Sequence, residues 1–488
     1  MSKIFSQQSV ASLVFLLVLT ACQGTNNRAG TAQINSRPEQ LLGICAADIQ
    51  AFRSLVDQDG VTNVGAPALL SYPLLHSNRF LHTLSRSVQS DIEIREWTML
   101  LATLAIKTRA AENRNLATPW SNASLEQLAE CSRNFANDSE QQQNRNSVLA
   151  AVQRTDFPAH YLNGRQTLGA IALLRPFLKQ RILALHADER SWLLEEESFL
   201  RSNSYVYGAA PNGPTDEWMK AAYASNELAL PLLSQPQLDS LFEKHTPNFQ
   251  IESADANDLI GAPEWSAGKI QINSEKPTVY TLSSMTQFEG RKLLQLNYVI
   301  WFSERKPEAL IDLYSGNVDS IIWRVTLDEE GRVLLYDSIH SCGCYHKYFV
   351  VSDSLLAKAQ PDSKEPANIF QLDTAINSDR LTLTLTANEH YIVGVDRKSP
   401  NDQQESIRYG MAPYELLNNL ASSAGTRSLF DDQGLIAGSE RLERFTLWPT
   451  GILSVGAMRQ WGTHATGFIE EQHFDDANLL EKYFETRP

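Results

Sequence analysis

The sequence is short of cysteine, of basic charge and of long apolar runs. It has 5 cysteines in 488 residues, and its 42 Lys and Arg oppose 57 Asp and Glu, for a formal net charge of −15. This acidity argues against binding to nucleic acid and against electrostatic docking onto anionic lipid, because phosphate-rich surfaces attract positive patches. The apolar run from Val10 to Leu19 is about ten residues long. It is too short to cross a bilayer as a helix.

Three common catalytic signatures are also missing. The chain has no Gly-x-Ser-x-Gly elbow, no Gly-x-x-x-x-Gly-Lys loop and no His-Glu-x-x-His pair. The sequence therefore gives no motif for a serine hydrolase, a P-loop nucleotide-binding protein or a zinc protease of that type.

The N-terminus predicts export. Lys3 precedes the apolar run, which ends in Leu19-Thr20-Ala21-Cys22 and resembles a bacterial lipobox. The resemblance implies a signal peptide over residues 1–21, with Cys22 first in the mature protein and carrying the lipid, such as palmitate. Gln23 in place of Asp favours the outer membrane over the inner. The alternative is an ordinary secretory signal with a chance cysteine.

This address has consequences for partners. The lipid on Cys22 is expected to hold the protein on the outer-membrane bilayer, facing the periplasm. Residues 1–21 carry one charged side chain, Lys3, so their removal makes the net charge −16. Membrane association is then expected from the lipid, not from a charged face, and nucleic acid is not an expected partner. Residues 22–40 are polar and predict a disordered tether.

The period of the apolar residues divides the rest of the chain. Residues 41–245 have helical spacing, and the segment 167–185 predicts a core or interfacial helix rather than a transmembrane one. Residues 246–488 alternate in the manner of strands, most clearly in a hairpin of 321–327 and 332–339. The predicted fold class is α+β, with a mostly helical domain followed by an antiparallel-sheet-rich α+β domain. Within the second domain we expect a helix over 412–421 and a strand over 445–448.

Metal-binding side chains are concentrated in His340-Ser341-Cys342-Gly343-Cys344-Tyr345-His346. In a straight strand the two histidines would be about 20 Å apart, so one ion reaches both only if the chain folds around Gly343. Two thiolates and two imidazoles suit zinc or copper. The sequence thus predicts His340, Cys342, Cys344 and His346 as metal ligands, although zinc ribbons usually have two or more residues between cysteines.

Other interpretations of this segment stay open. Cys342 and Cys344 could form a strained, easily reduced disulfide across Gly343 with a redox role. They could instead pair with Cys45 and Cys131, or be small buried side chains in a turn. Because exported proteins form disulfides, a Cys45–Cys131 bridge is also predicted, with two buried free thiols as the alternative.

Two further clusters contain polar side chains. Glu304 and Arg305 end an apolar strand and are weak candidates for an acid/base residue and an anion clamp, or for one surface ion pair. Arg324 lies in an apolar strand and needs a buried partner, for which Asp319 and Asp337 are candidates.

The third cluster is Arg459-Gln460-Trp461-Gly462-Thr463-His464. Its side chains could bind a carboxylate or a sugar ring. His464 could instead supply an additional ligand to the metal site, and a Gly-rich turn between strands explains the cluster almost as well.

Several stretches resemble a family of uncharacterised proteobacterial lipoproteins. They are Leu296 to Arg305, Trp323 to Leu327, Tyr336 to His346 and Gly456 to His464. The resemblance covers most of the mature chain and implies an envelope address, but no activity.

Three functions follow as hypotheses. The first is a metal-binding (zinc or copper) envelope lipoprotein. The second is a metal-dependent envelope hydrolase with Glu304 as the base. The third is a non-enzymatic structural or assembly lipoprotein whose cysteines form disulfides.

Overall fold

The computed structural model describes residues 45–137, 142–155, 157, 160–194, 204–208, 218–360, 364–372, 380–396 and 406–487. The predicted signal peptide, Cys22 and the tether lie outside these residues. Helices and antiparallel-rich sheets both make up large parts of the chain, so the fold class is α+β.

Helices dominate the region before residue 246. The longest, α5 (Asp91–Asn115), begins with a capping box in which Ser90 and Glu93 satisfy each other's backbone N–H groups. Its Trp97, Leu101 and Ala105 are fully buried at a spacing of four residues. The other α-helices are α3 (Cys45–Asp59), α4 (Arg79–Leu84), α6 (Asn122–Asn137), α7 (Gln142–Gln153), α8 (Asn163–Leu168), α9 (Ile171–Leu194), α11 (Met219–Tyr223), α12 (Gln235–His245) and, near the C-terminus, α13 (Leu479–Tyr483).

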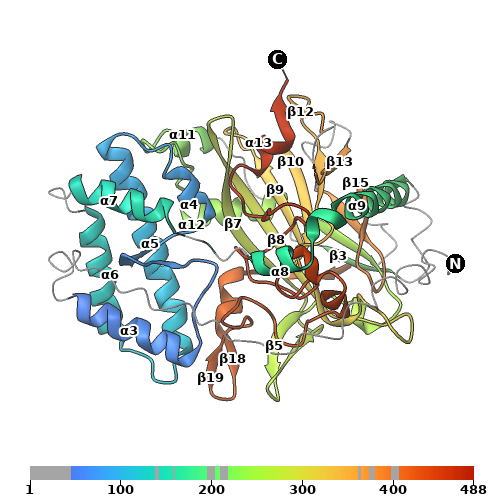
Figure 1. Cartoon of the computed structure of the whole chain (residues 1–488), viewed down its shortest axis with the longest axis horizontal. Coiled ribbons are helices and arrows are strands. Elements are labelled where there is room, and N and C mark those ends of the chain that lie inside the picture. Colours follow the sequence, from blue (N-terminus) through green and yellow to red (C-terminus); the bar gives the residue numbers. More distant parts are fainter. Residues whose placement is uncertain are drawn as a thin grey trace. The chain divides into compact units, whose positions relative to one another are not determined.

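One apolar core joins α4, α5, α6 and α7, which lie together in Figure 1. The two-stranded sheet of β1 (Ala68–Leu69) and β2 (Tyr72–His76) contributes Leu69 and Leu75 to this core. Cys45, at the start of α3, and Cys131 of α6 are disulfide-bonded.

A seven-stranded sheet forms the centre of the second half. Its order is β13-β11-β10-β9-β8-β7-β17, antiparallel from β7 to β11 and parallel at both edges. The strands are β7 (Thr278–Phe288), β8 (Arg291–Arg305), β9 (Gly316–Leu327), β10 (Val333–His340), β11 (Lys347–Val350), β13 (Asn368–Gln371) and β17 (Gly410–Pro413). The predicted hairpin is confirmed as β9 and β10, whose turn places Gly331 at φ 80°.

A five-stranded sheet packs on one face of the seven-stranded sheet. Its order is β15-β14-β4-β3-β16, from β3 (Ser204–Gly208), β4 (Asn248–Glu252), β14 (Thr382–Leu385), β15 (Ile392–Asp396) and β16 (Ser406–Arg408). Phe249 and Leu383 of this sheet share a fully buried core with Leu296 and Trp323 of the larger one. The polar chain described below lies at one end of this interface.

The opposite face of the large sheet is covered by C-terminal segments. Trp301 and Ile322 pack there against Met458 and Phe474. The other short elements of the described residues are β5 (Ala262–Ser266), β6 (Lys269–Asn273), β12 (Leu355–Ala357), β18 (Leu420–Ser422), β19 (Gly425–Arg427), β20 (Phe484–Thr486) and the 3₁₀ turns η1 (Ala256–Asp258), η3 (Tyr414–Asn419), η4 (Leu442–Phe445) and η5 (Trp448–Thr450).

Two local predictions were wrong. Residues 412–421 are not one helix, because 410–413 pair in parallel with β7 and only η3 follows. Residues 445–448 are not a strand but lie in and between η4 and η5. In both places the contacts that the segment makes in the folded protein outweigh its local secondary-structure preference.

At residue 245, the expected domain boundary, the secondary structure changes from a helix to a strand. α12 ends at His245 and β4 begins at Asn248. Residues 47–488 nevertheless group as one compact unit, and β3, from before the boundary, pairs with β4. None of the helices in the described part of the chain is both long and apolar enough to span a bilayer.

Candidate functional site

The Cys/His segment forms the turn between β10 and β11. The Gly343 N–H donates to the carbonyl of His340 at 2.8 Å, and the His340 N–H to that of Cys344 at 3.0 Å. Gly343 has φ 92°, and a Cβ there would collide with the backbone oxygen of Ala465. The chain therefore does fold around Gly343, and only glycine fits the place.

This turn does not bring the four predicted ligands together. His346 Nε2 lies 2.8 Å from Asp337 Oδ2, whereas His340 Nδ1 lies 3.7 Å from Asp319 Oδ1. Asp337 and His340 are three residues apart on β10, so their side chains leave opposite faces of the sheet. Among the residues the structure describes, no three or more His, Cys, Asp or Glu are grouped so that they could hold a metal ion.

The thiols and His464 lie in the covering layer. Cys342 and Cys344 are both free thiols, and their side chains contact each other. Arg459 is fully buried, with its Nε donating to the carbonyl of Cys342 at 3.1 Å and Nη1 2.6 Å from His160 Nδ1. His464 is buried beside Trp461 and Phe474, and within the described part of the chain neither of its ring nitrogens has a hydrogen-bond partner.

Arg324 finds one of its two predicted partners. Its guanidinium binds both oxygens of buried Asp337, at 2.8 and 2.5 Å, and lies over the ring of Phe474. His346 binds the same carboxylate, and burial lowers the pKa of His346 despite Asp337. Arg324 and Asp337 are both fully buried, which is typical of a structural ion pair.

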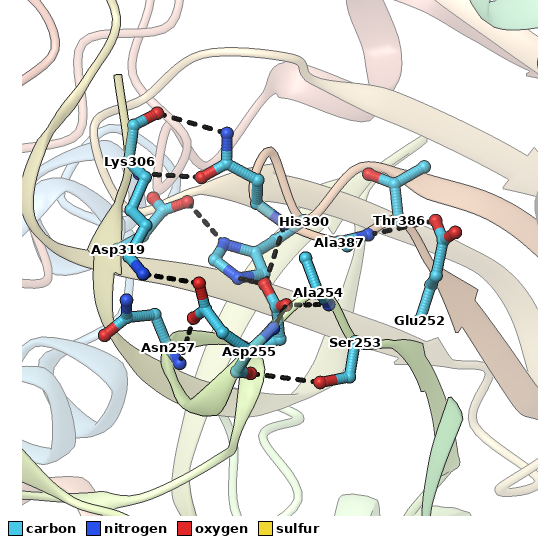
Figure 2. A network of polar contacts seen from close by, with 12 residues as sticks. Glu252, Ser253, Ala254, Asp255, Asn257, Lys306, Asp319, Thr386, Ala387 and His390 are labelled. Carbon is cyan, nitrogen blue, oxygen red and sulfur yellow. Dashed lines mark hydrogen bonds and ion pairs between the residues drawn. The ribbon is translucent and has the colours of Figure 1, made fainter. Parts of the chain in front are cut away.

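A buried Asp–His–Asp chain lies at the other face of the sheet, between the two sheets. His390 is fully buried, with Nδ1 2.9 Å from Asp319 Oδ2 and Nε2 3.3 Å from Asp258 Oδ1. Its ring stacks on Phe302, with centroids 3.8 Å apart and planes 4° from parallel. Figure 2 shows His390 among the surrounding carboxylates and amides.

Local structure fixes each member of this chain. Asp319 is opposite Phe302 in the β8–β9 register, and Asp258 ends η1, which Asp255 caps. His390 has φ 54° in the tight turn between β14 and β15. A positive φ is costly for a residue with a Cβ and is often found at functional sites.

Asn388 ties that turn to β8 and η1. Its side chain accepts from the Lys306 N–H at 2.6 Å and donates to the Lys306 carbonyl at 3.1 Å. Its own N–H donates to Asp258 Oδ1 at 2.7 Å. These bonds hold His390 in its strained conformation.

The contacts between Asp258, His390 and Asp319 determine how their pKa values shift. Burial disfavours the charged form of His390, but contacts with Asp258 and Asp319 outweigh it and raise the pKa of the imidazole. Burial likewise opposes ionisation of Asp258 and Asp319, yet their histidine contacts lower both carboxyl pKa values. These shifts favour an imidazolium between two carboxylates.

From Asp319 the chain continues to His340. Burial lowers the pKa of the His340 imidazole, although Asp319 opposes this, so the ring is neutral at pH 7. Its ring lies 5.0 Å from that of Tyr345 and 5.8 Å from that of Tyr391. The two tyrosine hydroxyls are 2.9 Å apart.

Arg305 is half-buried and lies next to Tyr391, at the end of the series of polar residues that runs from Asp258 through His390 and Asp319 to His340. One of its nitrogens donates to the Tyr391 hydroxyl at 3.4 Å, and its guanidinium faces the rings of Tyr314 and Tyr391. No carboxylate of the described residues forms an ion pair with it, unlike Arg324. A guanidinium with free donors beside tyrosine hydroxyls is suited to binding an anion.

Two carboxyl groups near Arg305 have unusual acidity. Burial raises the pKa of Glu443, on η4, to about 7, against the pull of Arg305 and Arg441. Burial also raises the pKa of Glu389 to about 7, with Arg305 opposing. A carboxyl group that titrates near neutrality can give or take a proton at physiological pH.

Glu304, the predicted base, is not part of this cluster. Neighbouring side chains on a strand point to opposite sides, and Glu304 acts electrostatically on Lys306 rather than on Arg305. Lys306 itself pairs with Asp255 at 2.5 Å.

The chain was compared with protein families, curated proteins and solved structures. No protein-family model, curated protein or solved structure matches the chain. The resemblance to a lipoprotein family stays a prediction.

Proposed function

We propose that the protein is a hydrolase of esters that carry an anionic group, with its site at the Arg305 end of the seven-stranded sheet. The observation that carries this proposal is the Arg305 guanidinium, which forms no close ion pair with a carboxylate of the described residues and is flanked by tyrosines. It is joined through Tyr391 and His340 to an oriented carboxylate, Asp319.

The proposed roles follow from charge and position. Arg305 binds the anionic group of the substrate, with the hydroxyls of Tyr345 and Tyr391 as further donors. Neutral His340, facing Asp319, takes a proton from water as its oxygen attacks the ester. Glu443, protonated below a pKa of about 7, gives a proton to the departing oxygen. Asp258 and His390 position Asp319 and keep it ionised.

The test is an ester pair that differs in charge. We expect para-nitrophenyl hydrogen succinate to be hydrolysed with a higher kcat/KM than the neutral para-nitrophenyl butyrate. R305Q should lower the value for the anionic ester about 100-fold, because hydrogen bonds to a charged group are worth about 1.5–3 kcal/mol each. The matched control is R427Q, which removes a guanidinium that lies over Trp265, 3.8 Å from its ring centroid, and should have no effect.

The proposal fails if R305Q and R427Q behave alike, or if neither ester is hydrolysed above the rate in buffer. If R305K retains part of the activity that R305Q loses, the positive charge rather than the shape of the guanidinium carries the binding.

A second candidate function is soft-metal binding by Cys342 and Cys344. It is supported by two contacting free thiols in a protein whose Cys45 and Cys131 are paired. Thiolates suit zinc or copper(I). C342S/C344S should then abolish stoichiometric metal in the purified protein, and retained metal would exclude these ligands.

We also propose the envelope address, supported by the Leu19 to Cys22 segment. Labelled palmitate should be incorporated into the protein and lost in C22A. Incorporation that persists in C22A would exclude the assignment.

A further inference from the structure

The segment that contains α8 and α9 differs in charge from the rest of the chain. Residues 162–187 contain four basic residues, Arg165, Arg175, Lys179 and Arg181, and no Asp or Glu. The whole chain has a formal net charge of −15. The average acidity therefore conceals one cationic region.

The same segment exposes large apolar side chains. Leu168 is 83% exposed, Leu173 81% and Phe177 53%. Leu162, Leu174 and Leu183 are exposed as well. Single exposed apolar residues are ordinary, but a contiguous group of this kind marks an interaction surface.

Two neighbouring segments extend this surface. Leu310 and Ile311, in the loop after β8, are exposed, as are Leu442 and Phe445 of η4. Hydrogen bonds join the three segments, from the Glu443 N–H to the carbonyl of Leu313 and from the Gln166 side chain to the carbonyl of Thr450. The apolar residues of the combined surface, here called the α9 face, are Leu162, Leu168, Leu173, Leu174, Phe177, Leu183, Leu310, Ile311, Tyr314, Leu442 and Phe445.

α9 is anchored at its C-terminal end, where it lies beside β15 (Figure 1). There Glu189 pairs with Lys347 at 3.1 Å, and Trp192 stacks on Tyr391. Earlier in the helix, Leu173, Phe177 and Ala184 are exposed on one side. At 100° per residue these three share a face, and Arg181 lies about 60° to one side of its centre, whereas Lys179 lies about 140° from it. An exposed apolar face bordered by a basic side chain is found in helices that lie in a membrane interface.

We infer that the α9 face docks on a lipid bilayer that contains anionic headgroups. The apolar side chains would enter the acyl boundary, and the exposed Arg165 and Arg181 would meet lipid phosphates. A bilayer supplies both an apolar layer for the exposed leucines and phenylalanines and anionic groups for the arginines, and docking on an acidic second copy is the outcome that the test below distinguishes. This inference does not depend on the proposed hydrolase function, but Tyr314 belongs to the α9 face and contacts Arg305, so the two sites adjoin.

The test is amide hydrogen exchange of the full chain on vesicles. It measures protection segment by segment, so it detects contact of the α9 face with lipid even if the N-terminus is also attached to the membrane. On vesicles of phosphatidylethanolamine and phosphatidylglycerol, exchange should slow in 163–187, 308–315 and 441–447, and remain unchanged in α6. On phosphatidylcholine vesicles the protection should be much weaker. Each basic residue near an anionic surface contributes about a fivefold factor, so R165Q/R181Q should lower the docking equilibrium about 25-fold.

A second variant removes the apolar part and a third serves as control. L173Q/F177Q should abolish the protection. L70Q/L232Q removes two exposed apolar side chains outside the α9 face and should leave the protection intact. The inference is overturned if α9 exchanges equally fast with and without vesicles, or if both α9 variants stay protected. Protection that arises without vesicles as protein concentration rises would also overturn it, in favour of self-association.

Discussion

His390 stacks face to face on Phe302, with ring centroids 3.8 Å apart, while its two nitrogens meet Asp319 and Asp258. The ring is thus held on one face by an aromatic side chain and at both edges by carboxylates. This fixes Asp319, the residue that His340 faces.

The charge on His390 predicts how stability depends on pH. Its pKa is raised in the folded protein, so it contributes stability fully below the ordinary histidine pKa of about 6.5, and loses it as pH rises through the higher folded value. H390Q should lower the free energy of unfolding by about 3–5 kcal/mol at pH 6. Urea unfolding from about pH 6 to about pH 9 should show the difference between wild type and H390Q narrowing. A constant difference would contradict an imidazolium at this position.

The raised pKa of Glu443 predicts the pH dependence of hydrolysis. As the proposed acid it must be protonated, so kcat/KM should fall as pH rises through about 7. E443Q should lower the rate and remove this alkaline limb. E415Q replaces a different glutamate, near the start of η3, and should keep the limb. An unchanged limb in E443Q would exclude the acid role.

The turn at Gly343 predicts a glycine requirement. G343A combines a left-handed backbone with a clash against the Ala465 carbonyl. G290A is the matched control, with φ 80° and open space around its Cβ position. G290A should cost about 1–2 kcal/mol of unfolding free energy, and G343A at least about 2 kcal/mol more. Equal urea midpoints for G343A and G290A would show that the 340–346 turn accommodates the added methyl group.

The cysteines predict a specific oxidation pattern. Without reductant, an alkylating reagent applied to the denatured protein should label Cys342 and Cys344 but not Cys45 and Cys131. Peptide mass spectrometry distinguishes the four. A C45S/C131S variant should lose about 2–5 kcal/mol of stability. Labelling of Cys45, or a disulfide between Cys342 and Cys344, would contradict the pattern.

Local patterns in the sequence predict the sheet better than the site. The β9–β10 hairpin follows from alternation around a turn that ends in Gly331, and the partner of Arg324 follows from the cost of burying a lone guanidinium. His390, Asp258 and Glu443 have no such signal, because they come from segments more than fifty residues apart and meet only in the folded chain. Polar residues at strand ends indicated Arg305, but not which neighbours would surround it. Net charge also did not reveal the basic stretch 162–187, since an average over the whole chain cannot show where charges are segregated.

The most direct test of the proposed site is kcat/KM of H340Q for para-nitrophenyl hydrogen succinate. The comparison is with wild type and with H82Q, which replaces a partly buried histidine on α4 whose ring meets that of Phe157 edge to face. General-base catalysis contributes about 100- to 10,000-fold, so H340Q should lose at least about 100-fold while H82Q stays within about threefold of wild type. If H340Q retains the activity of H82Q, His340 is not the base and the site does not work as proposed.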